Sequence, residues 1–228
     1  MKLKTRMTAS FLAAMMLCAG GSVFAEEKSY LDVDVQSPYY DAIMYMTDTG
    51  IFAGVSETEF APEASLTRGM FVTLLGRTYE NLNGSEGAPD QTDKKTSFQD
   101  VSESDYYAAA VGWAQKNGIV AGYTDERFAP NDVLTKEQAV SILFRFSNYA
   151  KDEFSSGEDT NILSYEDFET ISEYAIPSIQ WGLANDIIGD DGAKINADEV
   201  VTRAQAAQYL YNYTQKWFNS RTDSEVTE

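Results

Sequence analysis

Three copies of one segment recur along this chain at an almost constant spacing, and this repetition limits what the chain can fold into. Each copy opens with an aromatic-x-Asp pattern, and the three openings lie 68 and then 67 residues apart. The landmarks that keep this register are Tyr30-Leu31-Asp32-Val33, Phe98-Gln99-Asp100-Val101 and Tyr165-Glu166-Asp167-Phe168; Tyr45, Trp113 and Trp181; and Thr67-Arg68, Thr135-Lys136 and Thr202-Arg203. A register kept over the whole segment predicts three structural units of one kind.

The spacing of apolar residues predicts a helix, a loop and a second helix in each unit. In the second copy, apolar residues between Tyr107 and Gly118 recur at intervals of three and four, which places them on one helix face. We expect this first helix to stop at Gly50, Gly118 and, less favourably, Asp186, because a left-handed residue ends many helices and glycine adopts that conformation best. The predicted fold class is therefore mainly α.

The second helix of each unit is predicted to begin at a threonine cap. Thr135 with Gln138, and Thr202 with Gln205, fit the reciprocal pattern of a capping box, whereas Thr67 keeps only the cap. Behind each cap lies an apolar face that a single helix pair cannot bury. We therefore expect the three helix-loop-helix units to pack on one another, most simply around a shared centre.

These patterns divide the chain into predicted segments. Polar stretches at 83–96 and 151–161 have turn composition and almost no apolar residues, so they are expected to be exposed linkers. The expected divisions are a signal peptide at 1–25, repeats at 28–85, 96–151 and 162–218, and a disordered tail at 219–228.

The first 25 residues have the features of a secretory signal peptide. A basic head is followed by an apolar stretch from Phe11 to Cys18 and by Val23-Phe24-Ala25, a small-residue cleavage site. A membrane helix is the alternative, but the apolar stretch is too short to span a bilayer comfortably. A lipoprotein signal at Cys18 is a second alternative, which Leu17 disfavours because such signals carry a small residue there. We expect a secreted protein without membrane insertion after cleavage.

The composition of the remaining chain excludes several kinds of site. The protein has no histidine, and its single cysteine lies in the predicted signal peptide. Once that peptide is cleaved, the remaining chain can form no disulfide, no thiolate metal site and no site that depends on imidazole chemistry. That peptide carries three of the 17 basic residues and none of the 36 acidic ones, which leaves 14 against 36 and a net charge of −22. So acidic a surface argues against nucleic acid and anionic lipid as partners.

The ordered set of motifs resembles the S-layer homology (SLH) domain family, whose domains usually occur in threes. The shared order is an aromatic-x-Asp-Val opening, an aromatic helix position, Gly-Ile-x-x-Gly-Tyr, Phe-x-Pro and a capped Thr-Arg, and it covers about Tyr30 to Phe218. The resemblance implies a pseudo-threefold helical body with grooves between adjacent repeats. It also implies non-covalent attachment to a secondary cell-wall polysaccharide, often one with pyruvate ketals, and a location on the bacterial cell wall or surface layer.

The family signature Thr-Arg-Ala-Glu at the second helix implies which residues bind the polymer. It points to Arg68 and Arg203, with Lys136 in place of arginine in the second repeat. An arginine at a helix start offers a bidentate fork to a ketal carboxylate, beside backbone amides that favour negative charge. The other implied groove residues are Gly54, Gly122, Tyr123 and Asp125, with Thr67, Thr135 and Thr202 as caps that could also contact ligand.

The repeats also depart from this signature. Its final Glu is replaced by Met70, Gln138 and Gln205, and Asp190 and Asp191 occupy the loop positions of Gly122 and Tyr123. The groove of the third repeat is therefore the one expected to be inactive. We expect Trp113 and Trp181 to pack in the core, and Asp32, Asp100 and Asp167 to cap or brace the first helix of each unit.

The positions of the acidic residues argue against catalysis and against metal binding. A glycosidase needs a pair of carboxylates, but every notable acidic residue belongs to the repeat or to a linker. The segment from Asp190 to Asn196 has some features of an EF-hand loop, but aligning Gly192 with its sixth position puts Ile187 where a carboxylate is required. We predict no catalytic residue, no metal site and no cofactor.

Two functional hypotheses remain open at this point. The first is a non-enzymatic cell-envelope anchor that binds a secondary cell-wall polysaccharide in grooves between repeats. The second is a protein–protein scaffold or surface-layer assembly component whose polysaccharide sites have degenerated, as the missing Glu and Lys136 suggest. The partners are then a cell-wall polysaccharide in the first case, and other surface-layer or envelope proteins in the second.

Overall fold

The computed structural model describes residues 30–154, 156–190 and 192–225, and the predicted signal peptide lies outside them. The described residues are mainly helical, as predicted, and pair as strands only at isolated bridges. None of their helices has the length and apolar character needed to cross a bilayer. The helices are α1 (Tyr40–Asp48), α2 (Arg68–Asn83), α3 (Ala108–Lys116), α4 (Lys136–Ala150), α5 (Ile176–Ala184) and α6 (Arg203–Glu225), with 3₁₀ turns η1 (Phe168–Thr170) and η2 (Glu173–Ala175).

The predicted helix ends are confirmed by local geometry. Gly50 and Gly118 follow α1 and α3 with φ of 72° and 69°, and Asp186 adopts the same left-handed conformation after α5 with φ of 57°. At the start of α4 the hydroxyl of Thr135 accepts from Gln138 N, while Gln138 Oε1 accepts from Thr135 N. Thr202 and Gln205 make the same reciprocal pair at α6, and Thr67 accepts from Met70 N.

The C-terminal segment differs from the predicted disordered tail. Helix α6 continues as far as Glu225, so residues 219–225 are helical, and 226–228 lie outside the described residues. Arg221, in these added turns, contacts the body of the protein. Arg221 stacks on the ring of buried Trp217, 3.9 Å from its centroid, and its Nη1 lies 3.8 Å from the buried carboxylate of Asp152.

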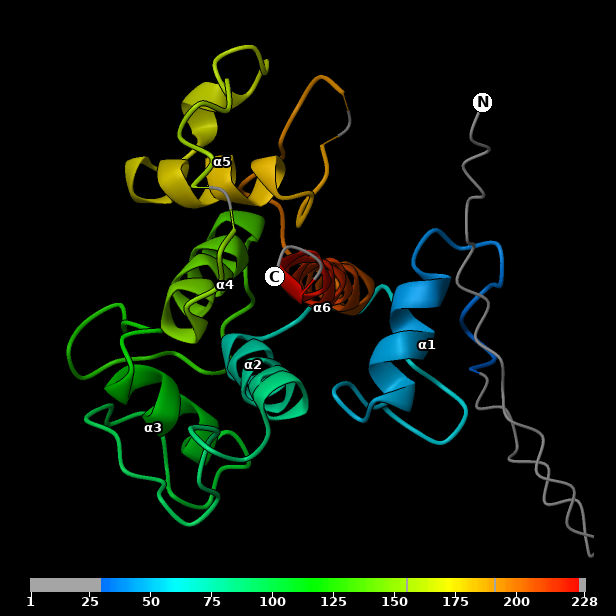
Figure 1. The fold of residues 1–228 in the computed structure, drawn as a ribbon. Coiled ribbons are helices and arrows are strands. Elements are labelled where there is room, and N and C mark those ends of the chain that lie inside the picture. The colour runs from blue at the N-terminus through cyan, green and yellow to red at the C-terminus, as the bar shows by residue number, and fades with distance from the viewer. Residues whose placement is uncertain (1–29, 155, 191, 226–228) are drawn as a thin grey trace, which may run out of the picture.

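The helices form an inner and an outer set, and their pairing crosses the repeat boundaries (Figure 1). The second helices α2, α4 and α6 lie around the centre, with α1, α3 and α5 outside them. Helix α3 packs on α2, α5 packs on α4, and α1 closes the ring by packing on α6. The first helix of each repeat therefore packs on the second helix of the repeat before it, rather than on its own partner.

A ring of three backbone hydrogen bonds marks the pseudo-threefold axis. Leu66 N donates to Val201 O at 2.9 Å, Val201 N to Leu134 O at 2.8 Å, and Leu134 N to Leu66 O at 3.0 Å. The three side chains are at most 1% exposed, so the ring lies over the core. The expectation that the units share a centre is confirmed, and the segment just before each second helix joins all three repeats.

The aspartates that recur at the opening of each repeat do not cap or brace the first helices, so that prediction is wrong. Asp32 accepts from the amides of Phe60 and Ala61, and Asp100 and Asp167 accept from the corresponding amides 28 and 29 residues downstream. The second amide of each pair belongs to a residue with positive φ. Each carboxylate thus holds the loop before the second helix in a conformation that a non-glycine residue rarely adopts.

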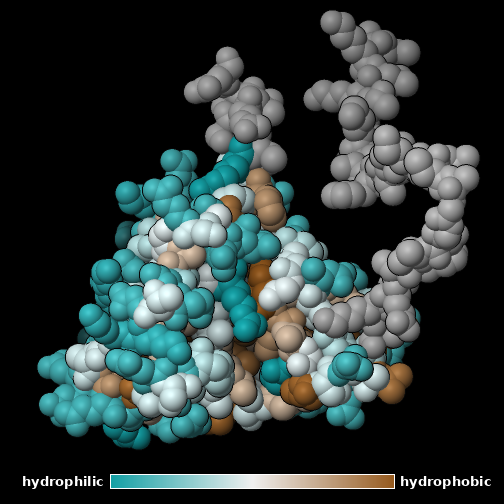
Figure 2. Space-filling view, turned by 90° about the horizontal axis from the view of Figure 1, so that it is seen from below, coloured by the Kyte–Doolittle hydropathy of each residue, from teal (hydrophilic) through white to brown (hydrophobic). Residues whose placement is uncertain are grey.

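Core packing explains the aromatic landmarks. Trp113 and Trp181 are 7% and 2% exposed, as expected for core residues. Phe60 and Phe128, from the Phe-Ala-Pro segments, are fully buried together with Ile195 at the same place in the third repeat. The outer surface is mostly hydrophilic, with a hollowed apolar seam on the face seen in Figure 2.

Candidate ligand-binding grooves between repeats

The first amides of the second helices are already used within the fold, which corrects one argument made from the sequence. In α4, Lys136 N donates to Glu199 O and Glu137 N to Ala197 O, both in the third repeat. The amides that begin α2 and α6 donate in the same way to carbonyls of the second and first repeats. The third amide of each helix is bound by the threonine cap. The first three amides of each second helix are therefore not free to bind an anion.

The three basic residues at the helix starts each reach into the loop of the next repeat. Arg68 Nε donates to Phe128 O at 3.0 Å, Arg203 Nε to Phe60 O at 2.8 Å, and Lys136 Nζ to Ile195 O at 2.5 Å. They are only 5%, 6% and 7% exposed. Each side chain therefore ties two repeats together. Arg68 and Lys136 each line a crevice between repeats, whereas Arg203 is not among the lining residues of such a crevice.

One of these crevices, which we call the Arg68 groove, combines residues from all three repeats. It encloses about 440 Å³. The first repeat contributes Arg68, the second contributes its loop and one face of α4, and the third contributes the segment before α5. Its lining residues are Arg68, Ala121, Gly122, Tyr123, Glu137, Gln138, Ser141, Ile142, Arg145, Ser172 and Tyr174.

Two guanidinium groups give the Arg68 groove its electrostatic character. Burial lowers the pKa of Arg68, and burial followed by the positive charge of Arg68 lowers the pKa of Arg145. Arg68 lies 4.6 Å from the ring centroid of Tyr123 and donates to two carbonyls, while Arg145 donates to Ile119 O at 2.8 Å. Arginine has five N–H donors, so within the described residues both keep donors for a ligand.

The acidic residue of this groove, Glu137, already accepts hydrogen bonds from within the protein. Glu137 accepts from Ser172 N at 3.0 Å, from Ser172 Oγ at 2.8 Å and from Tyr174 Oη at 3.1 Å. Burial, and after it the charge of Glu137, raises the pKa of Tyr174 to about 12, so the phenol stays protonated and donates. The groove thus has two arginines against one carboxylate that is already bonded.

The Lys136 groove is the equivalent site on the next repeat and has the opposite charge balance. It encloses about 380 Å³, with Lys136 opposed by Asp190 and Glu199. Asp190 occupies the position of Gly122 and accepts from Tyr165 Oη and Gly192 N. Asn212 stands where the Arg68 groove has Arg145 and donates to Ile187 O at 3.1 Å. Asp191 lies outside the described residues.

The lysine substitution and the degraded loop therefore meet in one groove. The sequence assigned Lys136 to the second repeat and the altered loop to the third, as if two sites were weakened. Because each second helix reaches into the following repeat, Lys136 faces the loop that carries Asp190. Arg68 instead faces the loop with Gly122, and Arg203 faces the loop with Gly54. In these two places, an arginine still faces a loop that keeps its glycine.

Arg203 is held in the same way by the loop of the first repeat. Arg203 donates to Ala53 O and Phe60 O and stacks on Phe52 and Phe60, 4.4 and 4.6 Å from the ring centroids. A smaller pocket of about 210 Å³ lies between α2 and the segment around Tyr106, and Arg203 is not among its lining residues. Three of its lining residues stand 68 positions before lining residues of the Arg68 groove: Thr73, Arg77 and Tyr106 against Ser141, Arg145 and Tyr174.

The other residues expected in the grooves have mainly structural surroundings. A Cβ on Gly54 or Gly122 would approach backbone oxygens to 2.6 and 2.2 Å, so both positions need glycine for close packing. Tyr123 lines the Arg68 groove, but Asp125 does not, and Ser97 donates to its backbone oxygen. The hydroxyls of the three threonines make the caps described above.

Sequence reasoning missed the second arginine and the exposed tyrosine of the Arg68 groove. Arg145 lies within a helix, where a solvated charge is the ordinary interpretation, and Tyr174 precedes one. The signal that could have found them is their recurrence, since Arg77 and Tyr106 occur 68 residues earlier. In the repeat register the equivalent positions are Asn212, which lines the Lys136 groove, and Pro38, which is not among its lining residues.

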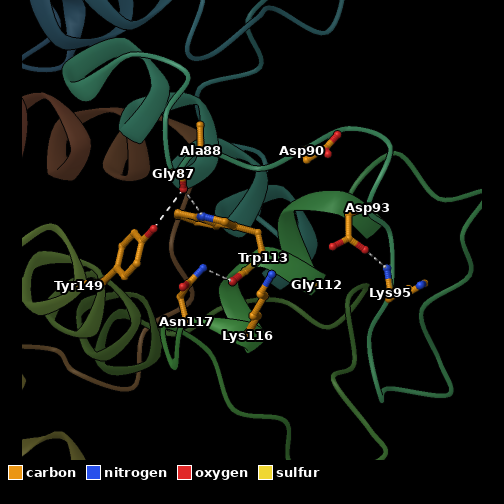
Figure 3. A pocket seen from close by; sticks show the side chains of 10 residues that line it. All are labelled: Gly87, Ala88, Asp90, Asp93, Lys95, Gly112, Trp113, Lys116, Asn117 and Tyr149. Carbon is orange, nitrogen blue, oxygen red and sulfur yellow. Dashed lines mark hydrogen bonds between the residues drawn. The ribbon is translucent and has the colours of Figure 1, made fainter.

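A further pocket, of about 240 Å³, lies under the first linker (Figure 3). There, Trp113 Nε1 and Tyr149 Oη both donate to Gly87 O, at 2.7 and 3.0 Å. The linker is largely exposed, as expected, but these bonds dock it on α3 and α4. In the part of the chain that the structure describes, acidic side chains form no cluster that could hold a metal ion.

The repeats with these crevices match a known family. Residues 29–69, 97–140 and 164–207 match the profile of the S-layer homology domain. The chain belongs to the S-layer homology domain family. The matched segments contain the three basic residues at the helix starts and the aspartates that hold each SLH loop, so the family pattern coincides with the contacts that join the repeats.

Several characterised proteins contain a related segment. The chain is 28% identical over 201 residues to an S-layer protein of Bacillus thuringiensis subsp. finitimus, which covers 87% of this chain and 23% of that protein. It is 28% identical over 150 residues to a cellulosome-anchoring protein of Acetivibrio thermocellus, covering 62% and 31%. It is 29% identical over 183 residues to the exoglucanase XynX of Acetivibrio thermocellus, covering 77% and 15%. The SLH chain thus spans less than a third of each relative.

Proposed function

We propose that this chain is a non-enzymatic anchoring module that binds an acidic cell-wall polysaccharide in the grooves between its SLH repeats. Membership of the family places it outside the cell, attached to the cell wall. The names of the relatives support an anchoring role, because they include S-layer proteins and a cellulosome-anchoring protein. The exoglucanase aligns over only 15% of its length, as expected for a module shared by proteins of different activity.

The observation that carries this proposal is the pair of arginines in the Arg68 groove, of which Arg68 is buried and Arg145 is half-buried. Both positive charges attract an arriving anion, and the lower effective dielectric of a partly buried site strengthens that attraction. A planar carboxylate matches the fork of an arginine, so an acidic sugar such as a pyruvate ketal is the chemistry that fits. The volume of about 440 Å³ is that of an ordinary small-ligand site.

The grooves are proposed to be unequal. The Arg68 groove is the main site, the Arg203 side is a weaker one, and the Lys136 groove does not bind the polymer because Asp190 and Glu199 oppose an anion there. The formal charge of −19 for the whole chain does not prevent binding. Charges beyond about 8 Å are largely screened at physiological salt, whereas groove arginines act at contact.

Co-sedimentation with purified cell walls tests this function. The protein without its predicted signal peptide is expected to pellet with native walls and to stay in solution with walls stripped of their attached acidic polymer. Because the interaction is proposed to be ionic, raised salt should weaken it. Undiminished binding to stripped walls would contradict the proposal and favour a protein partner.

A further inference from the structure

An exposed tyrosine at the edge of the Arg68 groove is held in place by a buried carboxylate. Tyr174 comes from the third repeat and is 57% exposed, yet its hydroxyl is bonded to Glu137. The two bonds from Ser172 fix the same carboxylate. One turn further on, Ser141 and Ser178 are hydrogen bonded at 2.7 Å, which joins α4 to α5 below. The ring of Tyr174 is therefore exposed to solvent and is also held in a fixed position by Glu137.

This arrangement belongs to the Arg68 groove alone. Glu137 is the second residue of α4, and the equivalent residues of the other repeats are Gly69 and Ala204. A Cβ on Gly69 would lie 2.9 Å from the ring of Tyr107 and 3.1 Å from Pro130 O, so no longer side chain fits there without movement. A carboxylate at this position is thus a departure from the repeat, and its contacts go to the groove edge.

Tyr174 also differs from the other aromatic residue of the groove. Tyr123 already has Arg68 and Arg127 near its ring, with centroid distances of 4.6 and 5.6 Å. No ring or guanidinium of the described residues stacks on Tyr174. Its face is available to a ligand that reaches toward Arg68 and Arg145 deeper in the groove.

We infer that Tyr174, positioned by Glu137, is the platform on which the ring of the bound acidic sugar packs, so that this groove selects a sugar over a small carboxylate. The inference rests on the proposed function of the groove. The carboxylate of the ligand pairs with the arginines, and the apolar C–H face of its ring covers the tyrosine. A fixed ring loses little freedom when the ligand binds, which favours affinity.

Calorimetric titration of the full chain with acidic oligosaccharides released from native walls tests this inference, with free pyruvate as a competing small carboxylate. Tyr174→Ala is expected to lower the oligosaccharide affinity about tenfold, as for the loss of a good aromatic contact. Tyr174→Phe keeps the ring and should stay within about threefold of the parent. Leu163→Ala, at an exposed apolar residue outside the groove lining, is the control and should change nothing.

The pyruvate arm separates a sugar platform from general damage to the groove. Competition by pyruvate should be unchanged in Tyr174→Ala and weakened in Arg68→Met. If Tyr174→Ala lost affinity for oligosaccharide and for pyruvate equally, the inference would be overturned. It would also be overturned if Tyr174→Ala kept the oligosaccharide affinity of the parent while Arg68→Met lost that affinity. If the parent protein bound neither probe, the proposed function itself would fail.

Discussion

Replacing both Arg68 and Arg145 by methionine is expected to lower the affinity for acidic wall oligosaccharides by about 100-fold. Each arginine is proposed to make a hydrogen bond between charged groups, and losing one costs about 1.5–3 kcal/mol. A cost of about 1.4 kcal/mol corresponds to a tenfold change in affinity, so two such bonds account for the expected loss. Calorimetric titration of the purified variant measures it.

The Lys136 groove provides a matched control. Lys136→Met combined with Asn212→Met removes the equivalent side chains, which also donate to the carbonyls of Ile195 and Ile187. Both double variants should lose a similar amount of thermal stability, because each leaves loop carbonyls without these donors. Only the Arg68 and Arg145 variant should lose affinity. Equal losses in the two variants would mean that the arginines act through the fold and not through the ligand.

Truncation of the chain after Asn161 is expected to abolish cooperative unfolding of the two repeats that remain. Helix α1 packs on α6, so α1 would lose that cover, and Tyr45 would lose its ring contact with Tyr211. Helix α4 would lose α5, and Phe146 would lose its contact with Tyr213. Each large side chain contributes about 1.5–3 kcal/mol when buried, and a whole domain is stable by only about 5–15 kcal/mol.

Circular dichroism during heating measures this effect. Truncation after Arg221 is the control, because it keeps the contacts of α6 with α1 and the interaction of Arg221 with Asp152. That variant should melt in one transition, like the full chain. A sharp transition with a native-like helical signal in the shorter fragment would show that the repeats fold independently, contrary to the ring described above.

The periodic features of the fold were predictable from sequence because they depend on local physics. Threonine caps and left-handed glycines are set by the residue and its neighbours, so Thr135 and Gly118 mark helix ends reliably. The pairing of helices was not predictable in this way. Apolar periodicity shows which face of α1 is buried, but it does not show that α6 covers that face.

The site was predicted less completely, for the same reason. Arg68 and Arg203 were identified through the family signature, but their near-complete burial and their bonds to the next repeat depend on the ring arrangement. Asp100 was expected to brace the first helix, but its amide partners lie 28 and 29 residues away in the loop before the second helix. The role of Glu137 could not be found by comparing the repeats, because only the second repeat has a glutamate at this position.

A crystal structure of the protein with an acidic oligosaccharide from its own wall tests the central claim most directly. We expect the sugar in the Arg68 groove, with its carboxylate between Arg68 and Arg145 and its ring against Tyr174, and we expect the Lys136 groove to be empty. A ligand bound in the Lys136 groove, or bound only outside the crevices between repeats, would contradict the account.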